Sequence, residues 1–181
     1  MPHFTFIMAV DPGITTGLAY GIVDHLSDVA TSELIAGNAE GLTVEQVYNK
    51  DEVKSGIEIA TLFMTLRQQY LAIKRPRCSK CVLVIEDFLL RGRVGSTKRE
   101  GLAPVRVTTA IHTTLMLKKV PFDNKETILV RRLPSEAMAY ATNPRLKDMG
   151  IYPATVGKEH GRDAARHWCT QVAKMRGDLR V

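Results

Sequence analysis

The feature that most constrains the fold is an almost uninterrupted apolar run that ends in a carboxylate. Residues 4–10, FTFIMAV, have the composition of a strand that is buried on both faces, and Asp11 follows directly, before the turn residues Pro12 and Gly13. A carboxylate at the end of a buried strand carries a high desolvation cost unless a partner compensates its charge. We therefore expect Asp11 to have such a partner, which must come from elsewhere in the chain or from a bound ion.

A second apolar run ends in the same way. Residues 81–86, CVLVIE, predict another strand buried on both faces, and its last residue is Glu86. We expect Cys81 to open this strand, with Cys78 in the loop before it. Further strands are predicted at 15–24, 28–36 and 126–133, and helices at 51–73, from Pro104 onward, at 135–141 and at 159–175. Residues 37–50 are expected to form a loop.

This order of elements, β-β-β-α-β-α-β-α, predicts an α/β fold with a five-stranded mixed sheet and helices on both of its faces. The sheet should be antiparallel in its first half and parallel in its second. The right-handed crossover rule makes the fourth strand a natural parallel neighbour of the first, so that Asp11 and Glu86 lie side by side. With 181 residues, the chain 1–181 is expected to be one domain.

The net charge, the cysteines and the apolar runs bear on three possible partners: a polyanion, zinc and a membrane. The formal net charge is +6, which mildly favours a polyanionic partner. A zinc site at Cys78 and Cys81 would need two further ligands at a familiar spacing, and no second CxxC or HxxxH follows. No apolar run approaches the roughly 18 residues of a membrane span, and the N-terminus does not resemble a secretory signal. We expect a cytoplasmic protein with no membrane partner.

Two carboxylates at adjacent strand ends repel each other, and a divalent cation between them would remove that cost. Oxygen ligands favour Mg²⁺ or Mn²⁺, and a two-ion site usually needs three or four such ligands. The sequence EHGRDAARH would add His160, Asp163 and His167 on one face of a helix, at i, i+3 and i+7. Each residue also has an ordinary explanation: Asp163 as a first-turn acid, Glu86 as a surface residue and the histidines as solvent-facing side chains.

Three motifs in this order, AVDPGITTGLAYG, VIEDF and HGRDAARH, resemble the RuvC-like family of Holliday-junction resolvases within the RNase H-like superfamily. The basic loop RGRVGSTKREGLAPVR and the LPSEA turn are most similar to small bacteriophage-encoded members. The resemblance implies a metal-dependent endonuclease that resolves four-way DNA junctions with two Mg²⁺ or Mn²⁺ ions per active site. It also implies a homodimer, located in the host cytoplasm if the chain is phage-encoded.

Carried over position by position, the resemblance makes Asp11, Glu86 and Asp163 the catalytic metal ligands, with His160 as a fourth ligand or a proton carrier. Lys147 falls near a basic residue that grips DNA in the family. Two positions depart from the family pattern. Met138 stands where a lysine is often found, and Leu89 stands where members carry a base-unstacking aromatic, with Phe88 one residue earlier.

The loop after Glu86 is rich in basic residues that could neutralise phosphates on both sides of a scissile bond. These residues are Arg91, Arg93, Lys98, Arg99 and Arg106. A solvated basic connection is the ordinary alternative. Three other functions stay open at this point: a nuclease for flaps, branched DNA or RNA–DNA hybrids, an actin-like or sugar-kinase-like nucleotide-binding protein, and a catalytically silent nucleic-acid-binding factor.

Overall fold

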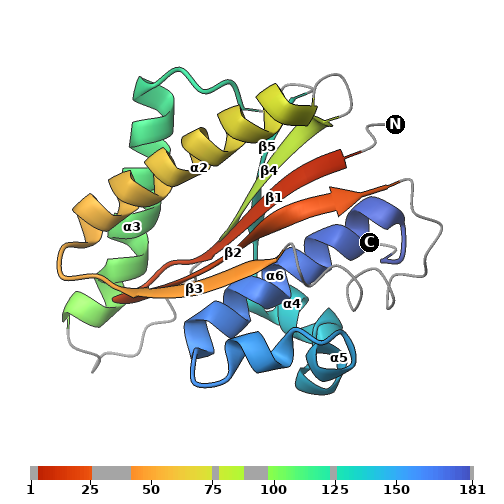
Figure 1. Cartoon of the computed structure of the whole chain (residues 1–181). Coiled ribbons are helices and arrows are strands. Elements are labelled where there is room, and N and C mark those ends of the chain that lie inside the picture. Colours follow the sequence, from red (N-terminus) through yellow and green to blue (C-terminus); the bar gives the residue numbers. More distant parts are fainter. Residues whose placement is uncertain (1–3, 26–41, 75–77, 88–97, 123–125, 180–181) are drawn as a thin grey trace.

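A five-stranded mixed sheet forms the centre of the molecule (Figure 1). The structure is a computed structural model that describes residues 4–25, 42–74, 78–87, 98–122 and 126–179. The strands are β1 (Phe4–Asp11), β2 (Thr15–Asp24), β3 (Thr43–Tyr48), β4 (Cys78–Glu86) and β5 (Thr127–Arg132), in the order β3-β2-β1-β4-β5. The first three strands pair antiparallel, and β4 is parallel to both β1 and β5. The predicted mixed sheet is confirmed.

Helices cover both faces of this sheet, also as predicted (Figure 1). One face packs against α2 (Glu52–Lys74) and α3 (Lys98–Leu117). The other face packs against α6 (Glu159–Arg176), with α4 (Pro134–Tyr140), α5 (Asn143–Asp148) and the 3₁₀ turn η2 (Tyr152–Thr155) beside it. Among the described residues, no helix combines the length and the apolar composition that a membrane crossing requires.

The alternation of side chains along the strands determines toward which face of the sheet the last side chain of each strand points. In β1, Phe6, Met8 and Val10 belong to the core under α2 and α3, whereas Ile7 and Ala9 belong to the core under α6. In β4 the even-numbered residues, Val82 and Val84, pack on the α6 side. Because the side-chain period of a strand is two residues, Asp11 and Glu86 both project toward α6. One helix can therefore reach both carboxylates.

The loop predicted at 37–50 is wrong, because this segment contains the strand β3. The strand predicted at 28–36 lies outside the described residues and stays a prediction, and β3 is the next described strand after β2. Among the described strands, β3 is an edge strand that pairs only with β2, and of its six residues only Val44 is buried. An edge strand with one buried side chain carries too weak an apolar alternation to be recognised in the sequence.

Two boundaries and one short helix also differ from the predictions. α3 begins at Lys98, six residues before Pro104, so that the proline lies inside the helix, where burial of Ala103, Val107 and Ile111 outweighs the hydrogen bond that proline cannot make. β4 begins at Cys78 and not at Cys81, because its first residue already pairs with Phe4 of β1. The polar segment after α4 contains the short helix α5, which Thr142 caps by accepting a hydrogen bond from the backbone N–H of Arg145.

Candidate active site

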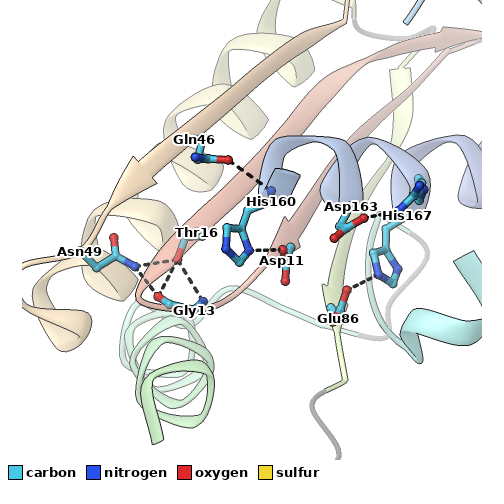
Figure 2. A network of polar contacts seen from close by, with 10 residues as sticks. Asp11, Gly13, Thr16, Gln46, Asn49, Glu86, His160, Asp163 and His167 are labelled. Carbon is cyan, nitrogen blue, oxygen red and sulfur yellow. Dashed lines mark hydrogen bonds and ion pairs between the residues drawn. The ribbon is translucent and has the colours of Figure 1, made fainter. Parts of the chain in front are cut away.

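The carboxyl ends of β1 and β4 form one wall of an open cleft. Val10 lies opposite Ile85 in the parallel pairing, so the residues that follow them, Asp11 and Glu86, are neighbours, as predicted. The cleft has a volume of ≈ 530 Å³, and it is lined by Asp11, Pro12, Gly13, Ile14, Thr15, Glu86, Pro104, His160 and Asp163. The topology thus gathers the three predicted acidic residues and His160 around one space (Figure 2).

The first turns of α6 complete this cleft because the helix crosses the sheet at unusually close range. Its backbone at His160 and Gly161 lies so near β2 that a Cβ atom added to Gly17 would overlap the carbonyl group of His160. A Cβ on Gly161 would itself come within 3.3 Å of the backbone oxygen of Glu45 on β3. Gln46 of β3 accepts a hydrogen bond from the backbone N–H of His160 at 3.2 Å. Two glycines and one side-chain cap therefore bring α6 to the strand ends.

Each of the three carboxylates pairs with a basic side chain of α6 (Figure 2). The contacts are Asp11 Oδ2 with His160 Nδ1 at 2.8 Å, Glu86 Oε2 with His167 Nε2 at 2.8 Å, and Asp163 Oδ1 with Arg166 Nη1. In each case the contact uses one carboxylate oxygen, and no side chain in the described part of the protein bonds the other. The cluster thus retains three oxygens that can bind a cation.

Burial and like charge both act on the pKa of Asp11. Its side chain is 9% exposed. The pKa of Asp11 is raised to about 6, with desolvation as the largest cause and the negative charges of Glu86 and Asp163 as further causes. The hydrogen bond with His160 acts in the opposite direction. The same hydrogen bond raises the pKa of His160, because the carboxylate stabilises the imidazolium. A bound cation would relieve the repulsion that raises the pKa of Asp11.

The donor set fits a hard divalent cation. Asp11, Glu86 and Asp163 offer carboxylate oxygens, and His160 offers a ring nitrogen, which suits Mg²⁺ or Mn²⁺. Within the described ranges, no group of three or more His, Cys, Asp or Glu side chains is already arranged as a metal-binding cluster. That agrees with the pairing of each acid to a base of α6. Binding an ion would use the second oxygen of each carboxylate.

The predicted DNA-binding residues do not line this cleft where the structure describes them. Arg91 and Arg93 lie outside the described residues, as do Phe88 and Leu89, and for Lys98 and Arg99 only the backbone in the first turn of α3 is described. Arg106 forms an ion pair with Glu52 of α2 at 3.7 Å. The amine of Lys147 lies 5.0 Å from the centre of the Tyr152 ring. Their role in DNA binding stays a prediction.

Sequence reasoning missed Arg132, a fully buried residue at the end of β5. It pairs in register with Glu86, and its guanidinium donates hydrogen bonds to the carbonyl oxygen of His167, at 2.8 Å, and to Oε1 of Gln171. The alternation that identifies Asp11 and Glu86 would also have identified Arg132, because Ile128 and Val130 precede it on the α6 side of β5. A third strand thus ends in a charged side chain directed at α6.

Asn49 was missed as well, and no signal in the sequence points to it. It is fully buried, and its side-chain amide donates hydrogen bonds to the carbonyl oxygen of Gly13, at 2.8 Å, and to Oγ1 of Thr16, at 2.6 Å (Figure 2). Its backbone N–H also bonds the carbonyl of Ile14 at 2.7 Å. These bonds hold the turn that follows Asp11 against the end of β3.

Comparison with solved structures identifies the fold. No protein-family model and no curated protein sequence matches the chain. Two structures of RuvC from Thermus thermophilus do match, each at 16% identity over 96% of both chains. The free protein gives a TM-score of 0.50, and RuvC in complex with a Holliday junction substrate gives 0.52. At this identity the likeness concerns the fold, and we conclude that the chain has the RuvC-like form of the RNase H-like fold.

Proposed function

We propose that this protein is a metal-dependent DNA endonuclease that resolves four-way junctions. The observation that carries the proposal is the meeting of three carboxylates, from the ends of β1 and β4 and from the first turns of α6, at one open cleft. The RuvC-like fold supports it, since one matching RuvC structure contains a Holliday junction substrate. The sequence motifs further suggest a small bacteriophage-encoded member, which would act in the host cytoplasm.

Asp11, Glu86 and Asp163 would hold two Mg²⁺ or Mn²⁺ ions through their second oxygens, with His160 as a further ligand or a proton carrier. When bound, such ions activate a water molecule and stabilise the leaving 3′-oxygen of a phosphodiester. His160 is 44% exposed at the rim of the cleft, and its Nδ1 faces Asp11, so it can hold a proton beside the reacting phosphate. Pro12 and Gly13 line the cleft with little side-chain bulk, which leaves room for the DNA backbone.

The basic residues after Glu86 would supply sequence-independent contacts to phosphates. In this proposal the contacts come from Arg91, Arg93, Lys98, Arg99 and Arg106, with Lys147 as a further contact. Such contacts give affinity and strong salt dependence without reading bases. Symmetric resolution of a junction requires two active sites, so the proposal includes a homodimer with two-fold symmetry.

The experiment that tests the function is cleavage of a labelled panel in Mg²⁺ and in Mn²⁺. The panel contains a four-way junction, a flap, duplex DNA, single strands and an RNA–DNA hybrid, and Asp11→Asn is the matched control because it keeps the shape of the side chain and removes its charge. We expect paired symmetric nicks in the junction that leave 5′-phosphate and 3′-hydroxyl ends, and no nicks with the variant.

Other outcomes would select the other functions. Cuts confined to flaps or hybrids would retain the metal chemistry and discard junction resolution. Absence of Asp11-dependent cleavage on every substrate would overturn the nuclease proposal. Tight nucleotide binding would then favour the actin-like or sugar-kinase-like alternative, and DNA binding without cleavage would favour a catalytically silent factor.

A further inference from the structure

We propose that His167 is a positioning residue that orients Glu86 for cation binding, through the hydrogen bond between its Nε2 and Oε2 of Glu86. The inference rests on the proposed function, since it assigns a task to a residue beside the candidate metal ligands. His167 does not line the open cleft and would not touch the substrate. Its effect on the reaction would pass entirely through Glu86.

Among the described residues, the His167 ring has one hydrogen-bond partner, Glu86. The side chain is 1% exposed, and its Nε2 lies 2.8 Å from Oε2 of Glu86, which is itself only 14% exposed. Both residues line a small cavity of ≈ 60 Å³, together with Asp163 and Arg166. The bond therefore holds one oxygen of Glu86, and the other oxygen of this cleft-lining residue is left for an ion.

Burial of one ring nitrogen of His167 lowers the stability of the folded protein. Nδ1 of His167 is buried and has no hydrogen-bond partner among the described residues. A ring that donates from Nε2 in its neutral form presents a lone pair at Nδ1, and an unpartnered buried polar atom disfavours the folded state. An aliphatic side chain would fill this position without that cost. The retained polar ring is accounted for by its bond to Glu86.

The backbone of α6 is fixed to the sheet at the same residue. Arg132 of β5, the register partner of Glu86, donates a hydrogen bond to the carbonyl oxygen of His167 at 2.8 Å. A second bond joins its guanidinium to Gln171, one turn further along the helix. Arg132 thus links α6 to the end of β5, beside Glu86 of β4. The Nε2–Oε2 bond consequently defines the orientation of Glu86 relative to a rigid frame.

The test compares two substitutions that differ in where they place a donor. In His167→Gln the side-chain amide nitrogen takes the place of Nε2 and can still donate to Glu86. In His167→Asn the amide takes the place of Nδ1 and falls short of Glu86. The first readout is Mn²⁺ binding to the full chain without DNA. The electron paramagnetic resonance signal of the free ion measures this binding. The second is the Mn²⁺ concentration that gives half-maximal junction cleavage.

We expect His167→Asn to weaken Mn²⁺ binding about 10- to 100-fold, the range found when the hydrogen-bond partner of a metal ligand is removed. The half-maximal Mn²⁺ concentration should rise by the same factor, with a smaller loss of rate at saturating Mn²⁺. His167→Gln should restore both values toward those of the wild type. This rescue separates positioning from packing, because both variants lose the aromatic ring.

Two results would overturn the inference while leaving the function intact. One is unchanged Mn²⁺ binding in His167→Asn. The other is an equal loss in both variants, matched by an equal fall in thermal stability, which would assign His167 to packing alone. If the wild type neither binds Mn²⁺ nor cleaves any substrate of the panel, the proposed function fails, and the inference fails with it.

Discussion

At the scale of single residues, the site is a set of carboxylates whose charges are compensated within the protein at a cost. Asp11 illustrates this cost, because burial and two neighbouring acids raise its pKa from 3.8 to about 6. A carboxyl whose pKa is higher in the folded than in the unfolded state loses stabilising effect as the pH rises through this range. The ionised Asp11 carboxylate, which metal binding requires, should therefore lower the unfolding free energy of the metal-free protein near neutral pH.

We predict that Asp11→Asn stabilises the metal-free protein at pH 7.5 and that the gain shrinks toward pH 4. A shift from 3.8 to about 6 corresponds to at most ~3 kcal/mol of unfolding free energy, at 1.36 kcal/mol per pKa unit. Urea unfolding in the presence of a chelator measures the gain across this pH range. Asp148→Asn, at an exposed position on α5, is the control and should show no comparable trend. Saturating Mg²⁺ should remove the advantage of Asp11→Asn, and a gain independent of pH would contradict the argument.

At the scale of elements, the decisive feature is the close crossing of α6 over β2 and β3. Gly17 and Gly161 permit it, and Gln46 caps the first turn of the helix from β3. The crossing brings His160 and Asp163 to the ends of β1 and β4. The helix then continues along the sheet to His167 and its contact with Glu86. The position of one helix thus sets the geometry of the whole site.

We predict that Gly17→Ala displaces the start of α6, lowers unfolding stability by about 1–3 kcal/mol and weakens Mn²⁺ binding. The stability comes from urea unfolding, and Mn²⁺ binding comes from the resonance of the free ion. Gly56→Ala is a matched control, since its added Cβ would lie 2.6 Å from Cβ of Ala110 at the contact between α2 and α3. That control should lose stability without losing affinity for Mn²⁺. Equal loss of Mn²⁺ affinity in both variants would show that Mn²⁺ binding depends on overall stability and not on the position of α6.

At the scale of the whole molecule, the two helical layers have different surfaces. The α6 layer carries the site, whereas α2 and α3 expose apolar side chains around a groove of ≈ 390 Å³. Its exposed apolar lining residues are Val53, Ile57, Val105 and Leu117. Exposed apolar area of this kind is typical of interaction surfaces. Because α2 is also the longest helix in the described part of the chain, this layer is the candidate face for the proposed homodimer.

We predict that the protein is a dimer in solution and that Ile57→Glu makes it a monomer. The glutamate would place a charge in the middle of the apolar groove, where pairing would bury it. Light scattering coupled to size-exclusion chromatography measures the mass, and Lys54→Glu, at an exposed position one turn earlier on α2, is the charge control. A monomeric variant should still nick a junction but should lose the paired symmetry of the cuts. A wild-type monomer would contradict the prediction.

We also predict that junction binding weakens steeply with salt. Replacing Arg91 and Arg93 together by glutamine should reduce the slope of log affinity against log salt by about 2, since each lost phosphate contact reduces it by about 1. Fluorescence anisotropy of a labelled junction in Ca²⁺ measures binding in the absence of turnover. The pair Lys118→Gln and Lys119→Gln, in the turn that directly follows α3, is the control. An unchanged slope would place the DNA path elsewhere on the molecule.

The sequence alone determined four of the five strands, the strand ends that carry Asp11 and Glu86, and the helix that carries His160 and Asp163. Alternation along a strand and the right-handed crossover are rules that operate on local sequence and on element order, so they can be read without coordinates. Tertiary structure alone decided which base meets which acid. The bond of His160 to Asp11 spans 149 positions and that of His167 to Glu86 spans 81. Such contacts depend on how closely α6 packs on the sheet, which no local pattern of residues specifies.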